Sequence, residues 1–216
     1  MRSFLFLVLL FSLKFSYGQQ KQCSCKTDTL INHFTTDCKT TLLRNGSKLY
    51  WQFNCDSIWL TLQDKNGKKI IIDTVPIEYY AYTYRLGYRL VKEYENTLLF
   101  RSGCPANGSC NFNLVDKSSG KKLKQFGELI YDHDKEKFYD FIIYFSSKNY
   151  LTIYFIDDNK KYNIRINGDN FTSVVPEYQF DKINLSNNIL TLVYNYEKDN
   201  KRKQGQITID LKKYVR

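Results

Sequence analysis

The chain has little proline, glycine and histidine. Three prolines and ten glycines among 216 residues form no linker-like stretch, so we expect one folded unit rather than several domains joined by linkers. The two histidines, His33 and His133, leave little material for acid–base or metal-ligating chemistry. Beyond the first 18 residues no apolar segment keeps a three-to-four-residue period, and long helices are therefore not expected.

The common catalytic motifs are also missing. The sequence contains no Gly-x-Ser-x-Gly, no Gly-x-x-x-x-Gly-Lys-Ser/Thr and no His-Glu-x-x-His, the patterns of serine hydrolases, phosphate-binding loops and zinc helices. Residues 132–137 place carboxylates around His133. They lack the glycine and the twelve-residue spacing of a calcium loop, so a polar turn is predicted there. We expect no catalytic residue, no metal and no cofactor.

Residues 1–18 are predicted to be a cleavable signal peptide. Arg2 precedes an apolar run over 4–11, and small residues stand at positions 16 and 18, before a cut at Gln19. The apolar run is too short to cross a bilayer, which needs about 20 residues. The expected product is exported to the periplasm, the cell surface or the medium, with a disulfide-tethered segment over 19–48 and a β-rich domain over 49–216.

All six cysteines follow the signal peptide, which predicts a disulfide framework in an oxidising compartment. Cys104 and Cys110 enclose a five-residue turn and are predicted to pair. Cys23 and Cys25 stand too close together in the sequence to bond each other. Each is expected to bond one of the other two cysteines, Cys38 and Cys55, and the sequence does not decide which bonds which. A zinc site of Cys23, Cys25, His33 and Cys38 is the alternative, but its spacing matches no zinc finger.

The rest of the chain predicts an all-β fold made of antiparallel hairpins. Segments rich in β-branched and aromatic residues alternate with turns such as Asn66-Gly67. We expect strands over 49–55, 58–62, 70–72, 111–115, 138–145, 150–156, 162–166, 190–196 and 206–211.

Two observations favour a small or incomplete propeller-like array over the alternative, a β-sandwich. Hairpins begin about 40 residues apart, near positions 112, 151 and 190, which resembles the blade period of propellers. Residues 138–145 and 150–156 are apolar at successive positions, as strands are when their sheet is covered on both faces.

Candidate ligand-binding residues concentrate in the tyrosine-rich segment 78–90. Read as a strand, it places Tyr80, Tyr82, Tyr84, Leu86, Tyr88 and Leu90 on one face, which the leucines mark as a core face. The other face carries Tyr79, Arg85 and Arg89, and Trp59 points away from the core face of its own strand. We therefore predict Trp59, Tyr79, Arg85 and Arg89 as ligand-binding residues, because aromatic and arginine side chains suit sugars and protein interfaces.

The formal charge is +10, and removing Arg2 and Lys14 with the signal leaves +8. For an exported protein this favours anionic glycans, lipid headgroups or acidic envelope proteins as partners, rather than nucleic acid. We expect a non-enzymatic domain that binds or scaffolds at the cell envelope or outside it. The alternative is an envelope polysaccharide hydrolase with two carboxylates that the sequence does not identify.

The richness in Asn, Lys, Ile, Tyr and Phe resembles exported β-rich proteins of Gram-negative bacteria with AT-rich genomes. This resemblance identifies no specific family and implies a role for no single residue. It does bear on four Asn-x-Ser/Thr sequons, which such a host would leave unmodified. They begin at Asn45, Asn107, Asn170 and Asn184.

Overall fold

The computed structural model describes residue 24 and residues 38–214. The predicted signal peptide over 1–18 lies outside these residues, as do Cys23, Cys25 and His33. No helix within the described part of the chain is long and apolar enough to span a membrane.

The fold is all-β, as predicted, and consists of four sheets of consecutive antiparallel strands. The first sheet contains β1 (Thr41–Leu42), β2 (Lys48–Phe53), β3 (Ser57–Gln63) and β4 (Lys69–Pro76), and the second contains β5 (Arg89–Glu93), β6 (Thr97–Ser102), β7 (Asn111–Asp116) and β8 (Lys122–Phe126). The third contains β9 (Phe141–Ser147), β10 (Tyr150–Phe155) and β11 (Lys160–Arg165), and the fourth contains β12 (Phe180–Ser186), β13 (Ile189–Lys198) and β14 (Lys201–Asp210). Short helical turns lie between the first and second sheets, η1 (Ile77–Tyr82) and α3 (Thr83–Leu86), and between the third and fourth, η2 (Gly168–Asn170) and η3 (Pro176–Gln179). A further turn, η4 (Leu211–Lys213), follows β14.

Polar turn residues close the hairpins. The Asp64 carboxylate accepts hydrogen bonds from the backbone N–H groups of Asn66 and Lys68 between β3 and β4, which ties the turn to its own side chain. Between β13 and β14, Asp199 and Asn200 both adopt positive φ, 55° and 56°. Two such residues define the tight turn whose twist suits a two-residue hairpin, so this hairpin turns more tightly than the sequence predicted.

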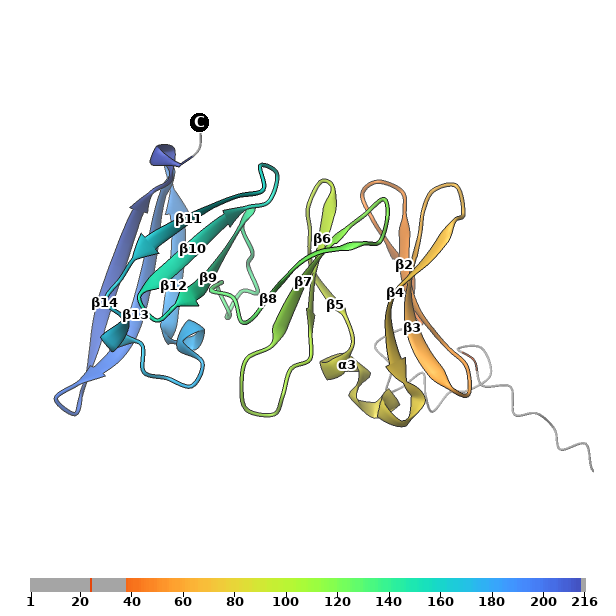
Figure 1. Ribbon diagram of the computed structural model, residues 1–216, viewed down its shortest axis with the longest axis horizontal. Helices are drawn as coiled ribbons and strands as arrows, with labels where there is room; N and C mark the ends of the chain where they lie inside the picture. The colour runs from red at the N-terminus through yellow and green to blue at the C-terminus, as the bar shows by residue number, and fades with distance from the viewer. Residues whose placement is uncertain (1–23, 25–37, 215–216) are drawn as a thin grey trace, which may run out of the picture.

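The four sheets follow one another in a row, from the N-terminal sheet to the C-terminal sheet (Figure 1). Three cores fill the spaces between them. Along β6, Leu98 and Phe100 face the core shared with the first sheet, while Leu99 faces the core shared with the third. The alternation follows from the two-residue period of a strand. The result is an array of four antiparallel hairpin sheets that pack one against the next.

Strands β9 and β10 of the third sheet have buried residues on both faces, as their apolar sequence predicted. Phe141 and Ile143 of β9 belong to the core shared with the fourth sheet. Ile142, between them, belongs to the core shared with the second. A strand that is buried on both faces needs apolar residues at successive positions. This explains why β9 and β10 show no alternation of apolar and polar residues.

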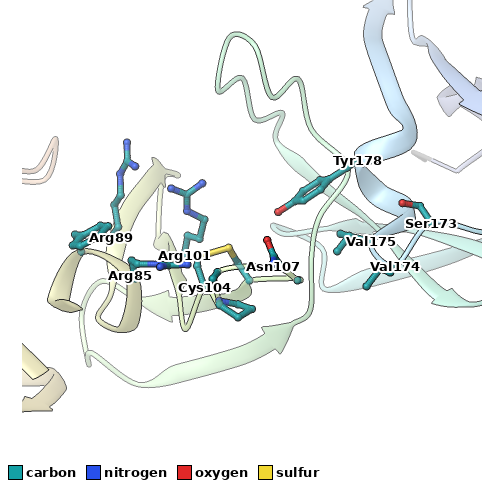
Figure 2. Close-up of a pocket in the computed structure, with 14 residues that line it drawn as sticks. Arg85, Arg89, Arg101, Cys104, Asn107, Ser173, Val174, Val175 and Tyr178 are labelled. Carbon is teal, nitrogen blue, oxygen red and sulfur yellow. A yellow bond between two sulfur atoms is a disulfide. The ribbon is translucent and has the colours of Figure 1, made fainter.

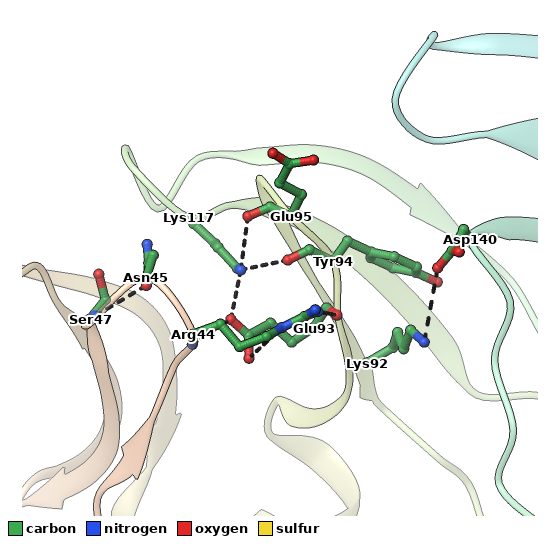
Figure 3. Close-up of polar contacts among 9 residues, drawn as sticks. All are labelled: Arg44, Asn45, Ser47, Lys92, Glu93, Tyr94, Glu95, Lys117 and Asp140. Carbon is green, nitrogen blue, oxygen red and sulfur yellow. Dashed lines mark hydrogen bonds and ion pairs between the residues drawn. The ribbon is translucent and has the colours of Figure 1, made fainter.

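A buried ion pair lies within the second sheet, and Arg44 from the first sheet contacts its carboxylate (Figure 3). Lys117 is buried, and its ammonium lies 2.6 Å from the Glu93 carboxylate and donates to the backbone carbonyls of Tyr94 and Glu95. Arg44, beside the first sheet, contacts the same carboxylate. Burial raises the pKa of Glu93, but the contacts from Lys117 and Arg44 outweigh burial and lower it.

The strand predicted over 78–90 is wrong. Those residues form η1 and α3, and β5 starts at Arg89. The segment crosses from the first sheet to the second, so it has no neighbouring strand to pair with. Thr83 is the buried residue of α3, and the predicted core residues Tyr82 and Tyr84 are half exposed.

The disulfide predicted between Cys104 and Cys110 is present, with Cα atoms 4.2 Å apart. Cys38 and Cys55 are both disulfide-bonded, which removes the Cys38 thiolate from the alternative zinc site. The partners predicted for them, Cys23 and Cys25, lie outside the described residues.

Candidate functional site

A pocket among the described residues has a volume of about 810 Å³. Figure 2 shows its two walls: arginines and the disulfide loop on one side, and the segment that leads into β12 on the other. We call it the arginine pocket. Its lining residues are Tyr84, Arg85, Arg89, Arg101, Ser173, Val174, Val175, Tyr178 and six residues of the disulfide loop between Cys104 and Cys110.

Strand pairing places two of these arginines together. In the antiparallel register of β5 and β6, Arg89 lies directly opposite Arg101, so both side chains leave the same face of the sheet. Arg85, on the adjoining α3, lines the same pocket. Like charges directly opposite one another destabilise a sheet, and a bound anion would relieve that repulsion.

The arginines differ in their partners. Arg89 lies 3.4 Å from the exposed Glu136 carboxylate, and both groups are well solvated, so this pair is weak. Elsewhere in the described chain, arginine–carboxylate pairs involve Arg44 and Arg202. Arg85 and Arg101 have no such partner among the described residues, and no carboxylate of that part of the chain lines the pocket. The pocket therefore has a net positive charge.

Glu128 braces both walls of the arginine pocket. It is buried, and its Oε2 accepts hydrogen bonds from the backbone N–H of Cys110 at 2.8 Å and from the Tyr178 hydroxyl at 3.0 Å. One carboxylate thus connects the disulfide loop to η3. Burial raises the pKa of Tyr178, and the Glu128 charge adds to the shift, so Tyr178 is a neutral hydrogen-bond donor at neutral pH.

An aromatic stack lies behind the pocket. The His133 ring packs on Tyr131, with centroids 3.9 Å apart, and meets the Tyr178 ring edge-on at 5.0 Å. Burial lowers the pKa of His133, and the charge of Arg101 lowers it further. His133 is therefore neutral at pH 7. Arg101 also contacts the Tyr131 side chain, and this contact lowers the pKa of Tyr131 against the larger effect of burial.

Glu177 gives the region a pH-dependent stability. It is buried in η3, and burial raises the pKa of its carboxyl to about 7, with a further contribution from the Glu128 charge. A pKa raised on folding stabilises the protein fully below the unfolded value near 4.5, and the benefit is lost as the pH rises through 7.

We expect Glu177→Gln to abolish this component. Relative to the variant, the wild type should lose about 2 kcal/mol, or about 4–8 °C in Tm, between pH 4.5 and pH 8. Thermal melts across this range measure the difference. Glu95→Gln, at an exposed position, is the control that should keep the wild-type profile. Parallel profiles for wild type and Glu177→Gln would show that Glu177 is not the group responsible.

Two of the four predicted ligand-binding residues, Arg85 and Arg89, line the arginine pocket. Tyr79 is exposed on η1 but does not line it, and Trp59 is half-buried on the face of β3 opposite the core. The structure thus separates Trp59 and Tyr79 from the two arginines. A ligand-binding role for each of the four stays a prediction.

Two further residues of the pocket, Arg101 and Tyr178, were not predicted from the sequence. A regular hairpin turning at residues 94–97 would have placed Leu90 opposite Arg101. A β-bulge between Leu90 and Lys92 brings Arg89 there instead, and the sequence does not mark that bulge. Tyr178 reaches the pocket from a segment about 75 residues further along the chain, and no local pattern marks such a contact.

No family model matches this chain, and no curated protein matches it. Among solved structures, the chain is similar to that of an uncharacterized protein, lmo1340, from Listeria monocytogenes EGD-e, with a TM-score of 0.36 and 11% sequence identity. The match covers 82% of this chain and 52% of the other, so this chain spans about half the length of that protein.

Proposed function

We propose that this is an exported, non-enzymatic binding protein that holds an anionic glycan in the arginine pocket. The observation that carries the proposal is the convergence of Arg85, Arg89 and Arg101 on one pocket without a lining carboxylate among the described residues. Guanidinium groups match carboxylate and sulfate oxygens in charge and in hydrogen-bond geometry.

Pocket shape supports a glycan as the ligand. A volume of about 810 Å³ lies in the range of small-molecule sites, about 300–1,000 Å³. Tyr84 and Tyr178 are about half exposed at its border, and each offers an apolar ring face with a polar tip. A sugar ring carrying an acidic group presents the matching combination of an apolar face, hydroxyls and charge.

Two buried carboxylates lie nearby, and their positions favour binding over hydrolysis. Hydrolysis of a glycosidic bond by two carboxylates needs both carboxyl groups to face one cleft, about 5–10 Å from each other. Glu128 and Glu177 are buried, and neither lines the pocket. Glu128 instead holds Cys110 and Tyr178 in place.

The proposal is tested by calorimetric titration of the secreted protein with two tetrasaccharides. One alternates glucuronate with N-acetylglucosamine, and the other contains neutral N-acetylglucosamine alone. We expect the acidic tetrasaccharide to bind at least about tenfold more tightly, and binding to persist when salt is raised from about 50 to 300 mM. Equal affinity for both sugars, or binding that vanishes in moderate salt, would contradict a specific anion site.

A further inference from the structure

Tyr178 is a common wall of three adjoining hollows. The arginine pocket shares Ser173 and Tyr178 with a groove of about 540 Å³, which we call the polar groove. A smaller hollow of about 360 Å³ beside His133 also has Tyr178 as a wall. With 49% of its surface exposed, the Tyr178 ring is accessible at the junction. The arginine pocket and the polar groove therefore adjoin at Tyr178.

The polar groove differs from the arginine pocket in its charge. Arg202 lies 4.0 Å from Asp181, which balances its charge, and Asn195 donates a hydrogen bond to the same carboxylate. Glu197 and Tyr196 also line the groove. Carboxylate, amide and hydroxyl groups without a net positive charge suit neutral hydroxyl-bearing units, because they both accept and donate hydrogen bonds.

We infer that the arginine pocket and the polar groove form one channel for a linear oligosaccharide. Its acidic unit lies at Arg85 and Arg101, and the neighbouring units pass over Tyr178 toward Tyr196. This inference rests on the proposed function, since it takes the arginine pocket as the anchor of the acidic unit. The inference adds that the ligand is longer than one acidic sugar unit, and that its acidic end lies in the arginine pocket and its neutral units in the polar groove.

The direction of the polar groove favours a sugar chain over an extended peptide. Asp181 belongs to β12, Tyr196 to β13 and Arg202 to β14, so the groove crosses three strands. A peptide that adds to a sheet needs an unpaired strand edge that runs along its length. Side chains line the polar groove across the sheet, which suits recognition through hydroxyl groups and ring faces.

Chain length provides the test. Affinities are measured by calorimetry for the glucuronate–N-acetylglucosamine disaccharide, for a tetrasaccharide that extends this disaccharide by two neutral N-acetylglucosamine units, and for hexaglutamate as an acidic peptide. We expect the tetrasaccharide to bind the wild type about tenfold more tightly than the disaccharide.

Tyr196→Ala and Arg202→Ala should remove most of this gain and leave disaccharide affinity unchanged. Because Arg202 is largely exposed, its replacement tests the channel without threatening the fold. Tyr150→Ala, at an exposed tyrosine outside the channel, is the matched control.

The outcomes separate the inference from the proposed function. Equal disaccharide and tetrasaccharide affinities, or a length gain that survives both substitutions, overturn the channel while the anion site stands. Absence of binding to every acidic sugar overturns both. Tighter binding of hexaglutamate than of the tetrasaccharide, reduced by Tyr196→Ala, overturns the choice of an oligosaccharide as ligand.

Discussion

Replacing Arg85 and Arg101 together by glutamine should weaken binding of the acidic tetrasaccharide by about 100-fold or more. Each guanidinium can donate charge-assisted hydrogen bonds to the acidic group, and each such contact contributes about 1.5–3 kcal/mol. Neither arginine pairs with a carboxylate among the described residues, so no internal salt bridge is lost with the charge. Calorimetric titration of the double variant measures the effect.

Two comparisons make this result specific. Arg165 is exposed on β11, outside the arginine pocket, and Arg165→Gln removes one positive charge, half the change in net charge of the double variant. We expect it to reduce affinity less than about twofold. Thermal melts must show that the double variant is folded, since Arg101 also contacts Tyr131. Equal losses from Arg165→Gln and the double variant would assign binding to overall charge.

The largest expected effect on stability comes from Lys117→Met. The substitution leaves the Glu93 carboxylate with Arg44 alone and removes the donor to the carbonyls of Tyr94 and Glu95. Breaking a buried ion pair by removing one partner costs about 3–5 kcal/mol. Because Arg44 still contacts Glu93, we expect about 3 kcal/mol, which corresponds to a Tm lower by about 6–12 °C.

The neighbouring Lys121 provides the control for this substitution. It lies in the same hairpin turn but is exposed, and Lys121→Met should change the free energy of unfolding by less than about 0.5 kcal/mol. Denaturant unfolding of both variants, with a double-mutant cycle that includes Glu93→Gln, separates the pair energy from other effects. Equal and small losses for the two lysines would show that the ion pair does not stabilise the second sheet.

Local patterns predicted much of the fold. The strand expected over 49–55 corresponds to β2, with Leu49, Trp51 and Phe53 buried, because alternation along a strand is visible in the sequence. The predicted strand is two residues too long, because β2 ends at Phe53, and Cys55 beyond it is exposed. The antiparallel pairing of consecutive strands was also predicted, from the turns between them.

The prediction failed where a segment connects sheets instead of belonging to one. Alternating tyrosines over 78–90 have the period of a strand, yet Pro76 ends β4 and no strand lies beside the segment. Periodicity reports which side chains can share a face, but a strand also needs a hydrogen-bonding neighbour. The arginine pocket shows the same limit, because Arg85 and Arg89 were predicted from a local pattern whereas Tyr178 reaches them through tertiary packing.

A crystal structure of the secreted protein with the glucuronate–N-acetylglucosamine tetrasaccharide tests the proposed site most directly. We predict a glucuronate carboxylate within about 3 Å of guanidinium nitrogens of Arg85 or Arg101, and a sugar ring packed on Tyr178. A tetrasaccharide bound elsewhere, such as over Trp59 on the outer face of the first sheet, or bound with its carboxylates turned to solvent, would contradict the account.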